Sequence, residues 1–106
     1  MIAEAAAELA RVDAEMNRLH QVLSTRLKDK PAILDRVRKS QKEWSEFRES
    51  QIEALFPSLP GETGSLTPLL RHVESTELAE IRIRGLKRLM LVHGVEDPQA
   101  SPGPRK

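Results

Sequence analysis

Apolar residues recur along the first part of the chain at alternating steps of three and four positions. This spacing places them on one stripe of an α-helix, which has about 3.6 residues per turn. The Ala and Glu residues around them also favour helix. We therefore predict a helix over about residues 3–28, whose inner face is formed by Ile2, Ala5, Leu9, Val12, Met16, Leu19 and Leu23.

A second helix is predicted from the break at "KDKPAI" to about residue 56. Asp29 is a plausible N-cap, and Pro31 suits a first helical turn, where its missing N–H is not needed. The inner stripe of this helix is completed by Gln41 and Arg48, which flank Trp44 at helical spacing. Polar side chains are therefore expected to face inward beside the one tryptophan.

A third helix follows the stretch "PSLPGETGSL", which is rich in turn-forming residues. Thr67 and Pro68 are typical of an N-cap and a first helical position, and Gly94 is typical of a C-terminal stop. The ending "VEDPQASPGPRK" is too rich in Pro, Gly and Ser to pack. We expect residues 1–93 to form a single helical domain and residues 94–106 to be a disordered tail.

Length and composition agree with this reading. A chain of 106 residues is about one domain, and 39% apolar and 31% charged residues with only 3% aromatics are typical of amphipathic helices. The predicted fold class is all-α: a small three-helix domain in which two long antiparallel helices have a third packed across them. The net charge of +1 gives the whole molecule no strong preference for nucleic acid or membrane. The lack of cysteine excludes disulfides and thiolate metal sites.

An inward arginine requires a partner, because an unpaired buried guanidinium is strongly unfavourable. Asp13 is the nearest candidate acceptor for Arg48, Arg82 or both, while Asn17 and Gln41 would satisfy the remaining groups and Trp44 would shield them. The alternative is that the arginines lay their stems on the core edge and keep their charged ends in water. The predicted polar cluster of the scaffold is Asp13, Asn17, Gln41, Trp44, Arg48 and Arg82.

Three segments that carry these residues resemble the signatures of the LprI-type lysozyme inhibitor-like domain. "VDAEMN" is similar to D-x-x-[LM]-N, "QKEWSEFR" to Q-x-x-W-x-x-[YF]-R, and "LAEIRIRGL" to L-T-x-x-R-x-x-x-L, in the family's order and over about residues 5–90. The resemblance implies a small helical protein, usually exported, with a protein partner of which a lysozyme is the founding example. It also implies that the matched polar residues belong to the scaffold.

The chain departs from the family pattern at four positions. Ile52 and about Glu74 stand where cysteines are common, Ala79 replaces the threonine of the third motif, and His20 stands where an aromatic residue often follows the Asn. The implied disulfide is therefore lost. These departures weaken the inference of export and suggest a divergent branch.

Catalytic chemistry has little support in the sequence. His20, His72 and His93 are dispersed, and neither a metal-binding His motif nor a nucleophile motif surrounds them. The glycines of "PGETGS" lack the lysine of a phosphate-binding loop. We expect a non-enzymatic protein without metal or cofactor.

Two kinds of function stay open at this point. In the first, a protein-binding module of the LprI-like kind contacts its partner through the loop residues Leu59, Glu62, Thr63 and Ser65, although this stretch also reads as a plain connector. In the second, an intracellular adaptor or nucleic-acid-associated protein uses a basic face of Arg84, Lys87 and Arg88. Nucleic acid is the less favoured partner, because no aromatic residues accompany these cations.

The assembly and the compartment are not fixed by the sequence. A homodimer is compatible with the wide spread of apolar residues on the third helix. The protein would be periplasmic or secreted if a signal has been removed, and cytoplasmic otherwise. No run of residues is long and apolar enough for a transmembrane segment.

Overall fold

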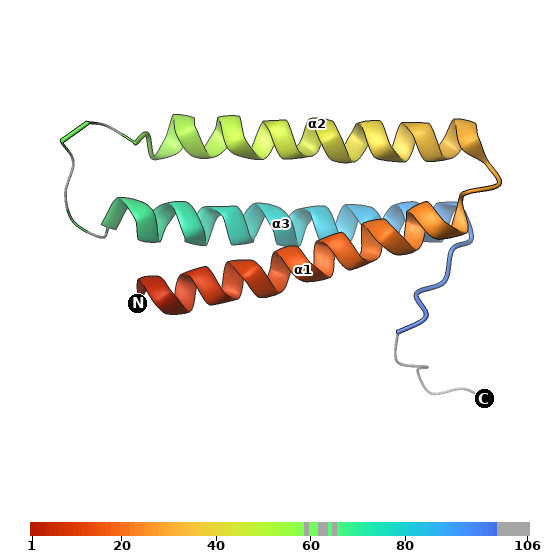
Figure 1. Cartoon of the computed structure of the whole chain (residues 1–106), viewed down its shortest axis with the longest axis horizontal. Coiled ribbons are helices and arrows are strands. Elements are labelled where there is room, and N and C mark those ends of the chain that lie inside the picture. Colours follow the sequence, from red (N-terminus) through yellow and green to blue (C-terminus); the bar gives the residue numbers. More distant parts are fainter. Residues whose placement is uncertain (59, 62–63, 65, 100–106) are drawn as a thin grey trace.

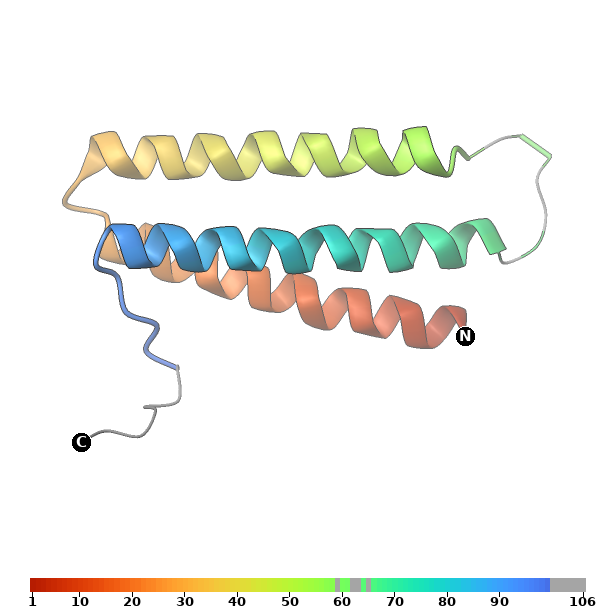
Figure 2. The ribbon, with the colours of Figure 1, turned by 180° about the vertical axis from the view of Figure 1, so that it is seen from behind.

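The computed structural model describes residues 1–58, 60–61, 64 and 66–99. These residues form three α-helices and no strand: α1 (Ile2–Arg26), α2 (Pro31–Leu55) and α3 (Leu66–Val92). Consecutive helices are antiparallel, α2 and α3 run side by side, and α1 is inclined across α3 (Figures 1 and 2). The all-α, three-helix class is confirmed, and each helix ends within about two residues of its expected position.

The core lies mainly between α1 and α3, and α2 contributes fewer contacts to either. One face of α1 is buried from Val12 onward, and its buried residues follow the three-and-four spacing of the sequence, whereas Ile2, Ala5 and Leu9 are only partly buried. α2 is buried only toward its two ends, where Leu34, Val37 and Ile52 enter the core. The other buried apolar residues are Val12, Met16, Leu19, Leu23 and Leu27 near or on α1, and Leu78, Ala79, Leu86 and Met90 on α3.

The turn between α1 and α2 starts the second helix differently from our expectation. Lys30, and not Asp29, is the N-cap residue, and no side chain caps this end. The Lys30 carbonyl accepts hydrogen bonds from the N–H groups of Ile33 and Leu34. Because Pro31 is the first helical residue, it excludes helical backbone at Lys30 and thereby sets the boundary.

The end of α3 is closed by a Schellman motif around Gly94. The N–H of Val95 donates to the carbonyl of Met90, and the N–H of Gly94 donates to that of Leu91. Gly94 has φ of +68°, in the left-handed region that glycine adopts without steric cost. Val95 then packs against the core. The helix stop that we predicted at Gly94 is thus completed by backbone hydrogen bonds and by an apolar contact of the next residue.

The other glycine of this helix has no comparable role. A Cβ built at Gly85 meets only the Arg82 Nη1 atom, at 4.0 Å. This separation is an ordinary van der Waals contact with the end of a flexible side chain. Space around Gly85 therefore tolerates a methyl group.

Alanine substitutions at these two glycines are predicted to change stability in opposite directions. Gly94→Ala forces a Cβ into the left-handed region and should lower the free energy of unfolding by about 1 kcal/mol. Gly85→Ala improves helix propensity and should raise it by about 0.5–1 kcal/mol. Urea unfolding followed by circular dichroism measures both changes. A loss of stability for Gly85→Ala would show that the helices need the missing side chain there.

Candidate functional site

Arg48, one of the inward polar residues of α2, forms an ion pair with Asp13 of α1 and also contacts α3. Arg48 donates to both carboxylate oxygens of Asp13 on α1, from Nη1 at 2.8 Å and from Nη2 at 3.2 Å. Its Nη1 also donates to the carbonyl of Ser75 on α3 at 3.4 Å. The guanidinium carbon lies 4.7 Å from the centroid of the Trp44 ring. The pair is partly buried, so these contacts replace the hydration that Arg48 loses.

A second group of polar residues surrounds Arg82 of α3 and also involves α2. Arg82 Nε donates to Gln41 Oε1 at 2.8 Å, and its Nη2 donates to Ser40 Oγ at 3.1 Å. Burial lowers the pKa of Arg82. Within the described part of the chain, its acceptors are neutral oxygens, and Asp13 is occupied by Arg48 alone. The predicted cluster is therefore divided into two groups.

Asn17 lies outside both groups, because its side chain is exposed. A step of four residues rotates the side-chain direction by about 40° around the helix axis. Asp13 already sits at the edge of the buried stripe, so the next turn carries Asn17 into solvent. Ser40, which we did not predict as a member of the cluster, accepts a hydrogen bond from Arg82. In the sequence, only its position next to Gln41 could have indicated this role.

His20 is partly buried near the Arg82 group. Its Nε2 atom is buried and lacks a hydrogen-bond partner among the described residues. Burial lowers the pKa of His20, and the positive charges of Arg82 and Arg38 lower it further. The neutral form is therefore favoured in the folded protein. This environment suits a scaffold residue that replaces an aromatic ring.

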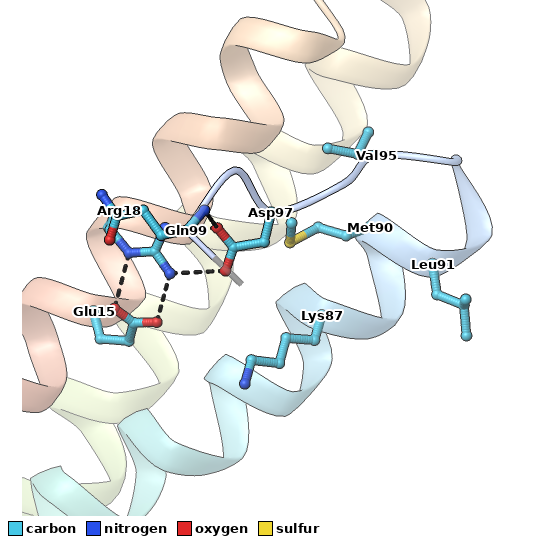
Figure 3. A pocket seen from close by; sticks show the side chains of 8 residues that line it. All are labelled: Glu15, Arg18, Lys87, Met90, Leu91, Val95, Asp97 and Gln99. Atoms are coloured by element: carbon cyan, nitrogen blue, oxygen red, sulfur yellow. Dashed lines mark hydrogen bonds and ion pairs between the residues drawn. The ribbon is translucent and has the colours of Figure 1, made fainter. Parts of the chain in front are cut away.

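The chain beyond α3 folds back onto α1 through an arginine with two acidic partners. Arg18 donates to Asp97 at 2.8 and 2.9 Å and to Glu15 at 2.9 and 2.8 Å (Figure 3). The Arg18 guanidinium holds the pKa of Asp97 at about 2. A cavity lies beside these contacts and is also lined by Lys87, Met90, Leu91, Val95 and Gln99. Neither the Asp97 ion pair nor the Val95 contact could be inferred from local composition.

An apolar groove with an acidic rim lies between the first turns of α1 and the N-terminal half of α3. Ala5, Val73 and Thr76 line it together with three carboxylates, Glu8, Glu77 and Glu80. Glu8 is paired with Arg11 at 2.7 Å. In the described part of the chain, Glu77 and Glu80 form no ion pair. We call this feature the acidic groove.

The remaining predicted residues fall into two sets. Leu59, Glu62, Thr63 and Ser65 lie outside the residues that the structure describes. Arg84, Lys87 and Arg88 are exposed on the C-terminal half of α3. Over the described residues, His, Asp and Glu side chains gather in no group that could hold a metal ion. Over the same part of the chain, none of the helices combines the length and apolar character needed to cross a bilayer.

Comparison with known proteins identifies the family. The family model described as "Lysozyme inhibitor LprI" matches residues 1–86. This range includes the Arg48 group, the Arg82 group and the acidic groove. The chain therefore belongs to the LprI family, as the three sequence motifs suggested. No curated protein and no solved structure matched the chain.

Removal of the Asp13 carboxylate is predicted to destabilise the fold. Asp13→Ala leaves the partly buried Arg48 with a long bond to one carbonyl and the Trp44 ring, so the free energy of unfolding should fall by about 1–3 kcal/mol. Glu46→Ala is the control, because it removes an exposed ion pair with Lys42 and should cost less than about 0.5 kcal/mol. Chemical denaturation measures both. Equal, small losses would mean that Arg48 is adequately hydrated.

The Arg18–Asp97 contact predicts a distinct response to acid. Because the pKa of Asp97 is lowered in the folded state to about 2, its stabilising effect is complete above the ordinary carboxyl range and is lost as the pH falls through that value. Titration of side-chain carboxyl signals by NMR should find Asp97 near 2 in the wild type. In Arg18→Gln the value should return toward the ordinary range, near 4. An unchanged titration of Asp97 between the two proteins would contradict the ion pair.

Proposed function

We propose that this chain is a non-catalytic protein-binding module that inhibits a cationic, lysozyme-type enzyme. The family assignment supports an inhibitor-like module in general. The acidic groove is the observation that carries the more specific proposal. It offers an apolar floor beside the carboxylates of Glu77 and Glu80, both of which lack an ion-pair partner among the described residues.

The size and chemistry of the groove favour a side chain of a protein partner. Its volume is about 230 Å³, which is below the range of about 300–1,000 Å³ that small-molecule sites usually occupy. A lysine or arginine side chain fits such a groove, because its alkyl stem can lie on Ala5 and Val73 while its charged end meets the carboxylates. The groove therefore suits a cationic protein surface.

The near-neutral net charge does not oppose this interaction. Residues 1–17 and 43–80 carry eleven acidic and three basic side chains, with Glu62 left out of the count. The helical parts of these segments lie toward the end of the bundle at which α1 begins (Figure 1). A cationic partner approaching this end meets a locally negative field.

This function assigns the protein to the compartment in which lysozymes meet the cell wall. We therefore favour the periplasm or the exterior over the cytoplasm. The inhibitor would act by occupying the enzyme's surface, and its own residues would perform no chemical step.

Charge reversal in the groove tests the proposal. The wild type should bind a cationic lysozyme and slow its hydrolysis of peptidoglycan, and the double variant Glu77→Lys/Glu80→Lys should bind at least about tenfold more weakly, which is about 1.4 kcal/mol. Isothermal titration calorimetry and a cell-wall lysis assay measure the two effects.

The matched control is Asp29→Lys/Asp35→Lys, which makes the same charge change at exposed positions of the segment 18–42, outside the acidic end. It should leave binding close to that of the wild type. Equal weakening by both variants would exclude the groove as the contact while leaving inhibition intact. Absence of wild-type binding to any lysozyme tested would refute the function itself.

A further inference from the structure

Charged residues of opposite sign are segregated to the two ends of the bundle. Residues 18–42 and 81–99 together carry twelve basic and four acidic side chains. Antiparallel packing places both segments at the end where α1 joins α2 and α3 terminates (Figures 1 and 2). The change of sign falls near the middle of each helix, between the level of the Asp13–Arg48 pair and that of the Gln41–Arg82 pair. A molecule with a net charge of +1 is therefore strongly dipolar.

The two ends act on their surroundings independently. The long axis of the molecule measures 54 Å, whereas charges in solution at physiological salt are screened over about 8 Å. A surface that touches the extremity of the basic end is therefore shielded from the extremity of the acidic end. The net charge of +1 gave no sign of an electrostatic partner. It does not describe the charge that either end presents to its surroundings.

The basic end also carries exposed apolar side chains. Leu91 is 79% exposed and Val92 is 67% exposed at the C-terminus of α3. Arg84, Arg88 and Leu91 follow at steps of four and three, so they share one face of the helix. Val92 adjoins that face four residues after Arg88, and Lys87 lies four residues before Leu91. We call these five residues, Arg84, Lys87, Arg88, Leu91 and Val92, the basic tip.

Surfaces that bind the headgroup region of an anionic membrane typically combine cationic side chains with exposed aliphatic ones. Nucleic acid offers the same negative charge but rewards aromatic stacking in its single-stranded form. The three aromatic residues, Trp44, Phe47 and Phe56, all lie beyond the middle of α2, in its acidic half or just after it. An apolar pair with no aromatic neighbour therefore favours lipid over nucleic acid.

We propose that the basic tip docks this protein on the surface of an anionic phospholipid membrane, with Leu91 and Val92 entering the headgroup boundary. The cations supply attraction, and the aliphatic pair supplies contact that salt does not screen. This inference is independent of the enzyme that the groove binds.

Co-sedimentation with lipid vesicles tests the proposal. The full chain should bind vesicles of phosphatidylglycerol and phosphatidylcholine in equal parts and should not bind phosphatidylcholine alone. Each basic side chain near an anionic surface strengthens binding about fivefold, so Arg84→Gln/Lys87→Gln/Arg88→Gln should bind roughly 100-fold more weakly. Leu91→Ser/Val92→Ser should weaken the part of the binding that persists at high salt.

The matched control removes the same charge elsewhere. Arg11→Gln/Lys39→Gln/Lys42→Gln changes three exposed cations outside the basic tip and should bind vesicles far better than the tip variant. Circular dichroism verifies that each variant is folded. Equal losses in the two triple variants, absence of vesicle binding by the wild type, or tighter binding to duplex DNA than to the anionic vesicles would each overturn the proposal.

Discussion

The burial of one face of α1 against α3 is the interaction on which the rest of the structure depends. Leu19 and Leu23 of α1 and Leu86 of α3 are fully covered by it, and the largest fully buried side chains all belong to this seam or adjoin it. Burial of each such side chain contributes about 1.5–3 kcal/mol, more than any exposed ion pair on the surface. Because the two helices supply their apolar faces to each other, α2 has little apolar surface left to cover. It is held at its two ends by Leu34, Val37 and Ile52.

The middle of α2 is positioned by polar contacts. Arg48 reaches from α2 to α1 and α3, and Arg82 reaches back from α3 to α2. These bonds are directional, whereas apolar contact tolerates sliding, so they fix the register of α2 along the other two helices. This arrangement explains why Gln41 and Arg48 interrupt an otherwise apolar stripe. Ile52, at one of the two positions where the resemblance implies a cysteine, is instead a buried apolar residue.

The same helix arrangement generates the surfaces proposed for binding. Antiparallel packing brings the acidic start of α1 beside the acidic first half of α3, and it brings the basic start of α2 beside the basic end of α3. The acidic groove is therefore lined by the N-terminal half of α3, and the basic tip is formed by its C-terminal half.

Local pattern determined the three helices, the inward position of Arg48 and the glycine stop at residue 94, because helical periodicity and backbone preference are properties of neighbouring residues. It also supplied the correct partner type for Arg48, since a buried cation needs a carboxylate. Only the tertiary structure decided which polar groups meet: Asn17 turns outward by a fraction of a turn, Arg82 takes Ser40 and Gln41, and Asp97 reaches Arg18 across 79 positions of sequence. The acidic groove and the segregation of charge likewise depend on which helix lies beside which. That choice follows from the shape of entire apolar faces, which no local window of sequence contains.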